Sequence, residues 1–240
     1  MRLAACLLCA LLLPLGSALP AQAPAKDKAP DAPRWEAQNK LLMEARRLIL
    51  AHRCQEALDG PLADVLAFFE AKYKDEKGQI FCATTQPETL FYLLTAAKDQ
   101  KKAIVLDAPW ATAHYMCAYA WFELGRMHKG RPHLEKAIAL SPADSMFLAE
   151  LAHYHQLDKD WPRALELFRR AEEGANMAST EDRKKADLGR AKRGIGYVLV
   201  ELGKLEEAAR EYEACLALDP QDKRASDELN YVRGRIRDKP

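Results

Sequence analysis

Histidine is the first residue type to consider in this sequence, because imidazole serves both as a metal ligand and as a general base. His153 and His155 stand two residues apart in the stretch HYHQLDKD. Residues two apart on a helix point about 200° from one another, so these two rings cannot face one ion. His114, His128 and His133 show no ligand spacing either. We therefore predict no metal site and no cofactor.

Motifs for nucleophilic catalysis and for phosphate binding do not occur in the sequence. It contains no G-x-S-x-G, no H-E-x-x-H and no glycine-rich phosphate loop. The acidic residues fall mostly on the outer faces of expected helices, as solvated charge, and no pair of carboxylates is singled out. The sequence therefore predicts a protein that is not an enzyme, with no catalytic residue to name.

The cysteines divide by their surroundings. Cys117 and Cys215 fall on helix faces that are expected to pack, where cysteine acts as a small buried apolar residue. Cys54 and Cys82 flank a helix expected over residues 61–73. If the loop after that helix folds back along it, the two come within bridging distance, and a disulfide would contribute ~3 kcal/mol. We take this pair as a disulfide candidate.

The N-terminus, MRLAACLLCALLLPLGSALPAQA, has the form of a secretory signal peptide. Arg2 precedes an apolar run of 13 residues, Leu3 to Leu15, which is shorter than the ~20 residues that span a bilayer. We predict a signal peptide over residues 1–18, cleaved between residues 18 and 23, and an Ala/Pro-rich linker over 19–33. The chain is then exported, either periplasmic or secreted, without a transmembrane segment after signal removal.

Charge excludes some partner classes. The chain has 36 Lys and Arg residues against 35 Asp and Glu residues. Because the expected signal peptide holds one Arg and no acid, the processed chain is electrically balanced. It has no long-range field to attract nucleic acid or an anionic membrane. The Ala-, Leu- and Arg-rich composition is typical of a bacterial protein.

Helical periodicity dominates from Trp35 onward, and no hairpin signal interrupts it, so an all-α fold is expected. The first helix should end at Gly60-Pro61, and Pro61 should open the next. The stretch KGQIFCATTQP indicates a loop with, at most, a short extended piece. A long helix is then expected over residues 88–106.

An internal repeat organises the second half of the chain. A shift of 34 residues places Ala137 on Ala171, and a shift of 78 places residues 123–125 (ELG) on 201–203 (ELG). The unit is therefore 34 residues, with an insertion of 10 residues between Glu172 and Leu188. We expect the insertion to lengthen the second helix of the second unit.

These units resemble tetratricopeptide repeats, which are pairs of antiparallel helices with small residues where the helices meet. Helices approach to ~8–10 Å only where the facing side chains are small. The resemblance implies a right-handed α-solenoid with repeats over 111–144, over 145–178 with the insertion to 188, and over 189–222. Extra helices over 34–110, which include a degenerate repeat ending KKAIVLDAP, would precede it, and a capping helix over 223–240 would follow. The small-residue positions are Ala118, Gly130, Ala137, Ala152, Ala164, Ala171, Gly196, Ala208 and Cys215.

The resemblance also implies a binding surface, because the first helices of such repeats line a concave groove that holds protein segments. The expected groove residues are Tyr115, Tyr119, Phe122, Met146, His153, Gln156, Arg190, Arg193 and Tyr197. Aromatic side chains at one end and basic ones at the other suit an extended peptide with apolar side chains and a carboxylate. Alternatively, some of these aromatic residues pack against the N-terminal helices or the inserted segment.

Three functions are compatible with this sequence. The first is an exported scaffold that binds a protein or peptide partner through the groove, within a periplasmic or cell-surface assembly. The second is an exported enzyme with an unrecognised site in residues 35–86. The third is a structural subunit that assembles through the ends of the repeat stack. The motif absences and the repeat favour the first.

Overall fold

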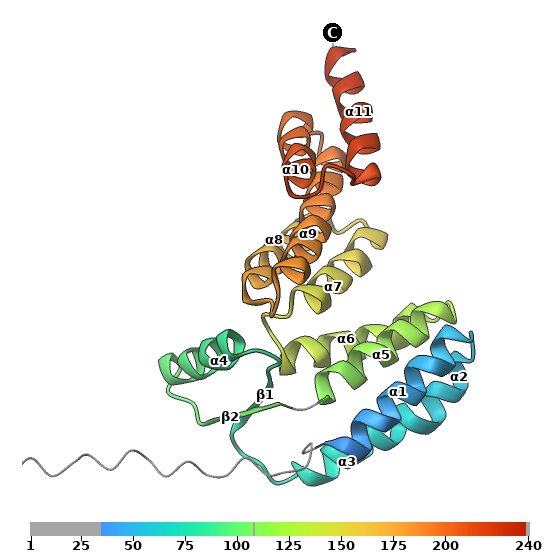
Figure 1. Cartoon of the computed structure of the whole chain (residues 1–240), viewed down its shortest axis with the longest axis vertical. Helices are drawn as coiled ribbons and strands as arrows, with labels where there is room; N and C mark the ends of the chain where they lie inside the picture. The colour runs from blue at the N-terminus through green and yellow to red at the C-terminus, as the bar shows by residue number, and fades with distance from the viewer. Residues whose placement is uncertain (1–34, 108, 239–240) are drawn as a thin grey trace, which may run out of the picture. The chain divides into compact units, whose positions relative to one another are not determined.

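A computed structural model describes residues 35–107 and 109–238, and helices make up most of this part of the chain (Figure 1). The predicted signal peptide and linker, residues 1–33, lie outside the described residues. The all-α helical repeat fold expected from the sequence is confirmed. In chain order the described elements are α1 (Glu36–Leu50), α2 (Cys54–Ala57), η1 (Leu58–Leu62), α3 (Ala63–Lys72), β1 (Gln79–Cys82), α4 (Gln86–Lys98), β2 (Ala103–Leu106), α5 (Trp110–Glu123), α6 (Met127–Leu140), α7 (Ser145–Leu157), α8 (Trp161–Gly174), η2 (Ala175–Met177), α9 (Glu181–Glu201), α10 (Leu205–Leu218) and α11 (Lys223–Arg237).

The three helix pairs α5–α6, α7–α8 and α9–α10 turn in the same way. The residue at the turn has a positive φ in each pair: 70° at Gly125, 59° at Lys159 and 74° at Gly203. One residue further on, a backbone N–H bonds to the carbonyl five residues back, as from Arg126 to Trp121 over 2.8 Å. These left-handed turns satisfy carbonyls at the helix end and send the chain back antiparallel.

The small-residue positions explain how closely the helices of a pair approach. All nine are buried, and the three bulky residues that face them, Leu134, Phe168 and Tyr212, are at most 1% exposed. A Cβ on Gly196 would lie 2.8 Å from the ring of Tyr212, and one on Gly130 would lie 2.9 Å from the Ala118 carbonyl oxygen. Larger residues at these positions would force the paired helices apart.

The insertion lengthens a different helix from the one predicted. Helix α8 ends at Gly174, where a Cβ would stand 2.1 Å from the Ala143 carbonyl oxygen. After the short η2 turn, α9 begins at Glu181 and runs for 21 residues, with Thr180 as its N-cap. The inserted residues therefore lengthen the first helix of the third repeat, because Thr180 accepts a hydrogen bond from the Arg183 N–H and starts a helix early.

The N-terminal helices also differ from the prediction. Helix α1 ends at Leu50, where His52 takes a φ of 57°, so the stop comes ten residues before Gly60. Gly60 and Pro61 lie inside a continuous helical segment, α2–η1–α3, as a kink with a widened turn. A glycine with φ −110° and ψ −106° supplies the bend that Pro61 needs, so the proline distorts the helix without ending it.

Residues 79–106 form a small βαβ unit, whereas the sequence predicted a loop with at most a short extended piece and then one long helix over residues 88–106. Strands β1 and β2 pair in parallel, with Gln79 opposite Ala103 and Cys82 opposite Leu106, and α4 connects them (Figure 1). Helix α4 stops at Lys98, and Gln100 has a φ of 55°. The stretch KKAIVLDAP is therefore not the end of a degenerate repeat. Its β-branched residues pair with a strand about twenty residues earlier, which no local pattern shows.

The last helix, α11, packs on α10. Asp222 caps it by accepting from the Ala225 N–H at 3.1 Å, and Ala225, Leu229 and Val232 are buried. Its other face is polar, as suits the end of a stack. None of the helices in the described part of the chain combines the length and the apolar character needed to cross a bilayer.

Candidate binding groove

An apolar pocket of about 440 Å³ opens beside helices α5, α7 and α9. Its large exposed side chains are Tyr119 and Phe122 of α5, Leu157 of α7 and Tyr197 of α9, which are 43 to 60% exposed. Leu134 and Tyr154 lie beneath them and are buried. We call this the apolar pocket, and its full lining is Tyr115, Ala118, Tyr119, Phe122, Leu134, Glu150, His153, Tyr154, Gln156, Leu157 and Tyr197.

Packing holds the aromatic rings of the apolar pocket in place. The ring of Phe122 lies 6.3 Å from that of Tyr154, whose hydroxyl donates to the Ala118 carbonyl at 3.3 Å. Tyr115 stacks on the buried Phe147 at 5.2 Å, and burial raises the pKa of the Tyr115 hydroxyl. Fixed rings lose little entropy when they bind, which suits an anchoring surface.

A second pocket of about 490 Å³ continues from the first and carries most of the charge. It shares Glu150, His153, Gln156 and Tyr197 with the apolar pocket, so the two form one groove. We call it the charged pocket, and its other lining residues are Arg190, Arg193, Gly194, Tyr212, Arg224 and Glu228.

The arginines of the charged pocket differ in whether they already form ion pairs within the chain. Arg193 is paired with Asp222, the N-cap of α11. Arg190 lies 3.6 Å from Asp187, a looser contact. Arg224 is exposed and has no ion-pair partner among the described residues. Because Glu150 and Glu228 face the same pocket, it offers both signs of charge, with Arg224 the most available cation.

Eight of the nine predicted groove residues line these two pockets, so the structure brings them together. Met146 is the exception, because it faces a different cavity and lies 3.9 Å from Arg183. Sequence reasoning missed Glu150 and Leu157, which share the helical spacing of His153, and Tyr154, which directly follows it. It also missed Arg224 and Glu228, since they come from the cap helix and lie outside the repeats.

The histidines occupy separate environments. His153 contacts Gln156 at 2.7 Å, and His155 contacts Asp160 at 3.2 Å. A pair that spacing did not indicate is His114 of α5 with His133 of α6, whose Nδ1 atoms lie 3.1 Å apart. Burial lowers the pKa of His114 to about 3 and also lowers the pKa of His133. The described residues hold no group of three His, Cys, Asp or Glu side chains arranged for a metal ion.

The structure contradicts the proposed disulfide. Cys54 and Cys82 are buried free thiols. Cys54 lies near Glu123, at the C-terminal end of α5, whereas Cys82 contacts Ala111, near the N-terminal end of the same helix. Twelve residues of helix separate those ends by roughly 18 Å, and bridged cysteines need Cα atoms within about 7 Å. The loop after α3 leads into β1, so it does not fold back along the helix.

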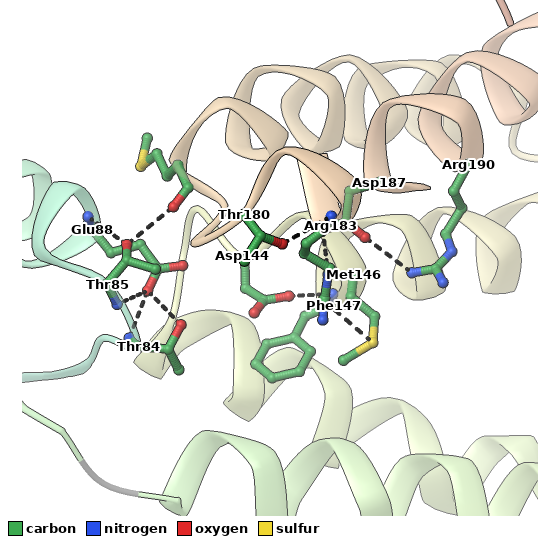
Figure 2. Close-up of polar contacts among 11 residues, drawn as sticks. Thr84, Thr85, Glu88, Asp144, Met146, Phe147, Thr180, Arg183, Asp187 and Arg190 are labelled. Atoms are coloured by element: carbon green, nitrogen blue, oxygen red, sulfur yellow. Dashed lines mark hydrogen bonds and ion pairs between the residues drawn. The ribbon is translucent and has the colours of Figure 1, made fainter. Parts of the chain in front are cut away.

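A polar cavity of about 270 Å³ lies where α4, α7 and α9 begin, and Figure 2 shows its contacts. Oε2 of Glu88 accepts from the backbone N–H groups of Thr84 and Thr85, at 2.7 and 3.2 Å. Asp187 accepts from Arg183 at 2.6 Å. The Thr85 hydroxyl donates to the Met177 carbonyl, which ties α4 to the turn before α9. These bonds position the βαβ unit against the repeats.

The comparisons agree with this architecture. Residues 194–222 match the family described as tetratricopeptide repeat. No curated protein matches the chain significantly. The structure of pilF from Pseudomonas aeruginosa aligns with 84% of this chain and 70% of its own, with a TM-score of 0.59 and 14% identity. A putative kinesin light chain from P. anserina, with nearly identical TPR-like repeats, aligns over 85% and 88%, with a TM-score of 0.55 and 16% identity. At sequence identities of 14% and 16%, the similarity to these structures shows the fold alone.

This chain therefore has a tetratricopeptide-repeat fold, with a βαβ unit and further helices before the repeats. The repeat match and the shared fold support a protein–protein interaction scaffold.

Proposed function

We propose that this chain is an exported scaffold that holds an extended segment of a protein partner in its groove, as part of a periplasmic or cell-surface assembly. The observation that carries the proposal is the continuity of the apolar and charged pockets through Glu150, His153, Gln156 and Tyr197. The N-terminal sequence with the form of a signal peptide supports export.

The lining of the groove suggests the chemistry of the segment. Exposed and preorganised Tyr and Phe side chains are the residues that anchor binding most often, and the apolar pocket would take an aromatic or branched apolar side chain. In the charged pocket, Arg224 suits a carboxylate, while Glu150 and Glu228 suit a lysine or arginine. We therefore expect a segment in which an apolar residue is followed by residues of both charges.

Tyr119→Ser with Phe122→Ser tests the apolar pocket, because both side chains are exposed and contribute little to the core. The matched control is Tyr231→Ser, an exposed tyrosine on α11 outside both pockets. A photo-crosslinking residue at position 157 should capture one envelope protein, and the double variant should reduce that capture at least tenfold. Capture that the double variant leaves unchanged, with the helical circular dichroism signal intact, contradicts the proposal.

The charged pocket needs a different design. Arg193→Ala would remove the pair with Asp222 and disturb the cap of α11, so lost binding would be ambiguous. Arg224→Gln tests the charged pocket, because it leaves every described ion pair in place, and Arg210→Gln on α10 serves as its control.

Export has its own test: N-terminal sequencing of the mature protein should find its first residue between positions 19 and 23. An intact N-terminus in the cell envelope contradicts cleavage.

A further inference from the structure

Helix α4 exposes a broad apolar face that the groove does not use. Leu90 is 59% exposed, Phe91 43%, Leu93 45% and Leu94 60%. At 100° per residue these four side chains fall within an arc of about 160°. The opposite side of the helix bears the buried Glu88, Tyr92 and Ala96. We call the exposed set, Leu90, Phe91, Leu93 and Leu94, the α4 apolar face.

The helix that carries this face is firmly anchored. Tyr92 is fully buried and stacks on Phe81 of β1 at 5.0 Å. Thr85 and Glu88 form a capping box at the helix start. Figure 1 shows α4 beside the β1–β2 pair, which it covers with its buried side. A helix that is apolar all round normally lies buried, yet α4 is covered on one side only.

Positive charge gathers at the C-terminal end of the same helix. Lys98, Lys101 and Lys102 are exposed, and Asp99 pairs with Lys101 at 3.7 Å. Lys77, in the loop before β1, lines the same surface depression as Lys101 and Lys102, where Asp75 and Glu76 offset part of the positive charge. The chain as a whole has almost no net charge, but local cations act on anions within the Debye length of ~8 Å.

These observations distinguish between possible occupants. Four partly exposed side chains present on the order of a few hundred Å², whereas a stable protein interface buries ~800 Å² on each partner. The face is therefore too small to hold a second copy by itself. A lipid surface needs no complementary shape, and it combines an apolar interior with anionic headgroups that match the lysines.

We infer that the α4 apolar face docks on an anionic lipid surface. Leu90, Phe91, Leu93 and Leu94 enter the boundary between headgroups and acyl chains, and Lys98 and Lys102 lie among the headgroups. The helix lies in the plane of the membrane surface and does not cross it. None of these residues lines the groove of α5, α7 and α9, so the two proposals fail separately.

Vesicle co-sedimentation of the full chain tests the inference. Vesicles of phosphatidylcholine with phosphatidylglycerol should bind the protein more tightly than vesicles of phosphatidylcholine alone. Leu90→Ser with Leu94→Ser should weaken binding at least tenfold. Met43→Ser with Leu50→Ser, which removes equally exposed apolar side chains from α1, should change nothing. Each of Lys98→Gln and Lys102→Gln should weaken binding to the anionic vesicles about fivefold, and Lys136→Gln should not.

A site-specific probe separates α4 from any other membrane-binding segment of the chain. Tryptophan at position 93 should be quenched by lipids with brominated acyl chains, whereas tryptophan at position 95, outside the apolar arc, should not. Equal quenching at both positions overturns the inference, as does vesicle binding that the Leu90 and Leu94 substitutions leave unaltered. A dimer in sedimentation velocity that those substitutions dissociate, without vesicle binding, would assign the face to a second copy instead.

Discussion

Gly194 of α9 and the ring of Phe168 of α8 lie in direct contact. A Cβ at position 194 would stand 2.3 Å from Cε1 of Phe168 and 2.5 Å from Cδ1 and Cζ. The ring cannot move aside, because Phe168 is fully buried and meets His153 edge-on at 5.2 Å. The second and third repeats can pack at this distance only because residue 194 has no side chain.

Gly194→Ala should therefore destabilise the protein, by about 1–3 kcal/mol for overpacking. Gly234→Ala is the matched control: it also lies within a helix, but a Cβ there meets nothing within 4 Å. That substitution should stabilise the protein by up to ~1 kcal/mol, through helix propensity. Urea unfolding followed by circular dichroism measures both. Equal effects of the two substitutions would show that the α8–α9 contact is looser than described.

The repeats could be predicted from sequence because their packing requires small residues at a fixed period. Ala137 and Ala171 recur 34 residues apart, since each fills the same kind of contact between two helices. The turn at Lys159 was harder to see, because lysine replaces the glycine found at Gly125 and Gly203 while keeping a φ of 59°. Packing positions that recur at a fixed period can therefore be predicted from sequence, whereas a single lysine in a left-handed backbone conformation cannot.

The βαβ unit could not be predicted, because its signal is not local. Residues 103–106, AIVL, form a short apolar run that suits a helix or a strand equally well. Only the pairing with residues 79–82 decides between them. The charged pocket shows the same limit: Arg224 and Glu228 reach it from α11, whose position relative to α9 follows from packing and not from the repeat pattern.

Asp144, the N-cap of α7, should make stability depend on pH. Burial raises the pKa of its carboxyl to about 6, and the nearby Glu88 carboxylate acts in the same direction. Between the unfolded value near pH 4 and pH 6, the folded state holds a proton that the unfolded state has lost. The contribution of the Asp144 carboxyl to the free energy of unfolding is therefore full below about pH 4 and is lost as the pH rises through 6.

Asp144→Asn keeps an acceptor for the Phe147 N–H and removes the titration. It should raise the free energy of unfolding at pH 7 by roughly 2 kcal/mol and flatten its change between pH 4 and 6. Asp227→Asn, on the exposed face of α11, should do neither. Urea unfolding at a series of pH values measures the free energy of unfolding of both variants. If the Asp144 variant shows the same pH dependence as the unsubstituted protein, burial of the Asp144 carboxyl is not the cause of that dependence.

His114 should make stability depend on pH in the opposite direction from Asp144. Burial lowers the pKa of its imidazole to about 3, with the nearby His133 and Lys136 adding to the shift. Between pH 6.5 and 3 the unfolded chain takes up a proton that the folded state excludes, so stability is lost as the pH falls through this window. His114→Phe, which keeps a ring beside Trp110, should lessen the acid loss, and His128→Phe on the surface should not. Melting temperatures at pH 7 and pH 4.5 compare them.

Cys215 fills a position that alanine fills in the other two repeats, Ala137 and Ala171. It is 1% exposed, its Sγ lies 3.7 Å from the Gly189 carbonyl, and burial raises the pKa of its thiol to about 11. A thiol held protonated and out of solvent has neither nucleophilic nor redox use, so its role is packing.

Cys215→Ala should lower the free energy of unfolding by about 1 kcal/mol or less, because the contact needs only a small side chain. Cys215→Leu should cost ~1–3 kcal/mol by overpacking, whereas Ala139→Leu on the exposed face of α6 should be neutral. Urea unfolding of the three variants decides the matter, since a large loss in Cys215→Ala would mean that the sulfur itself is required.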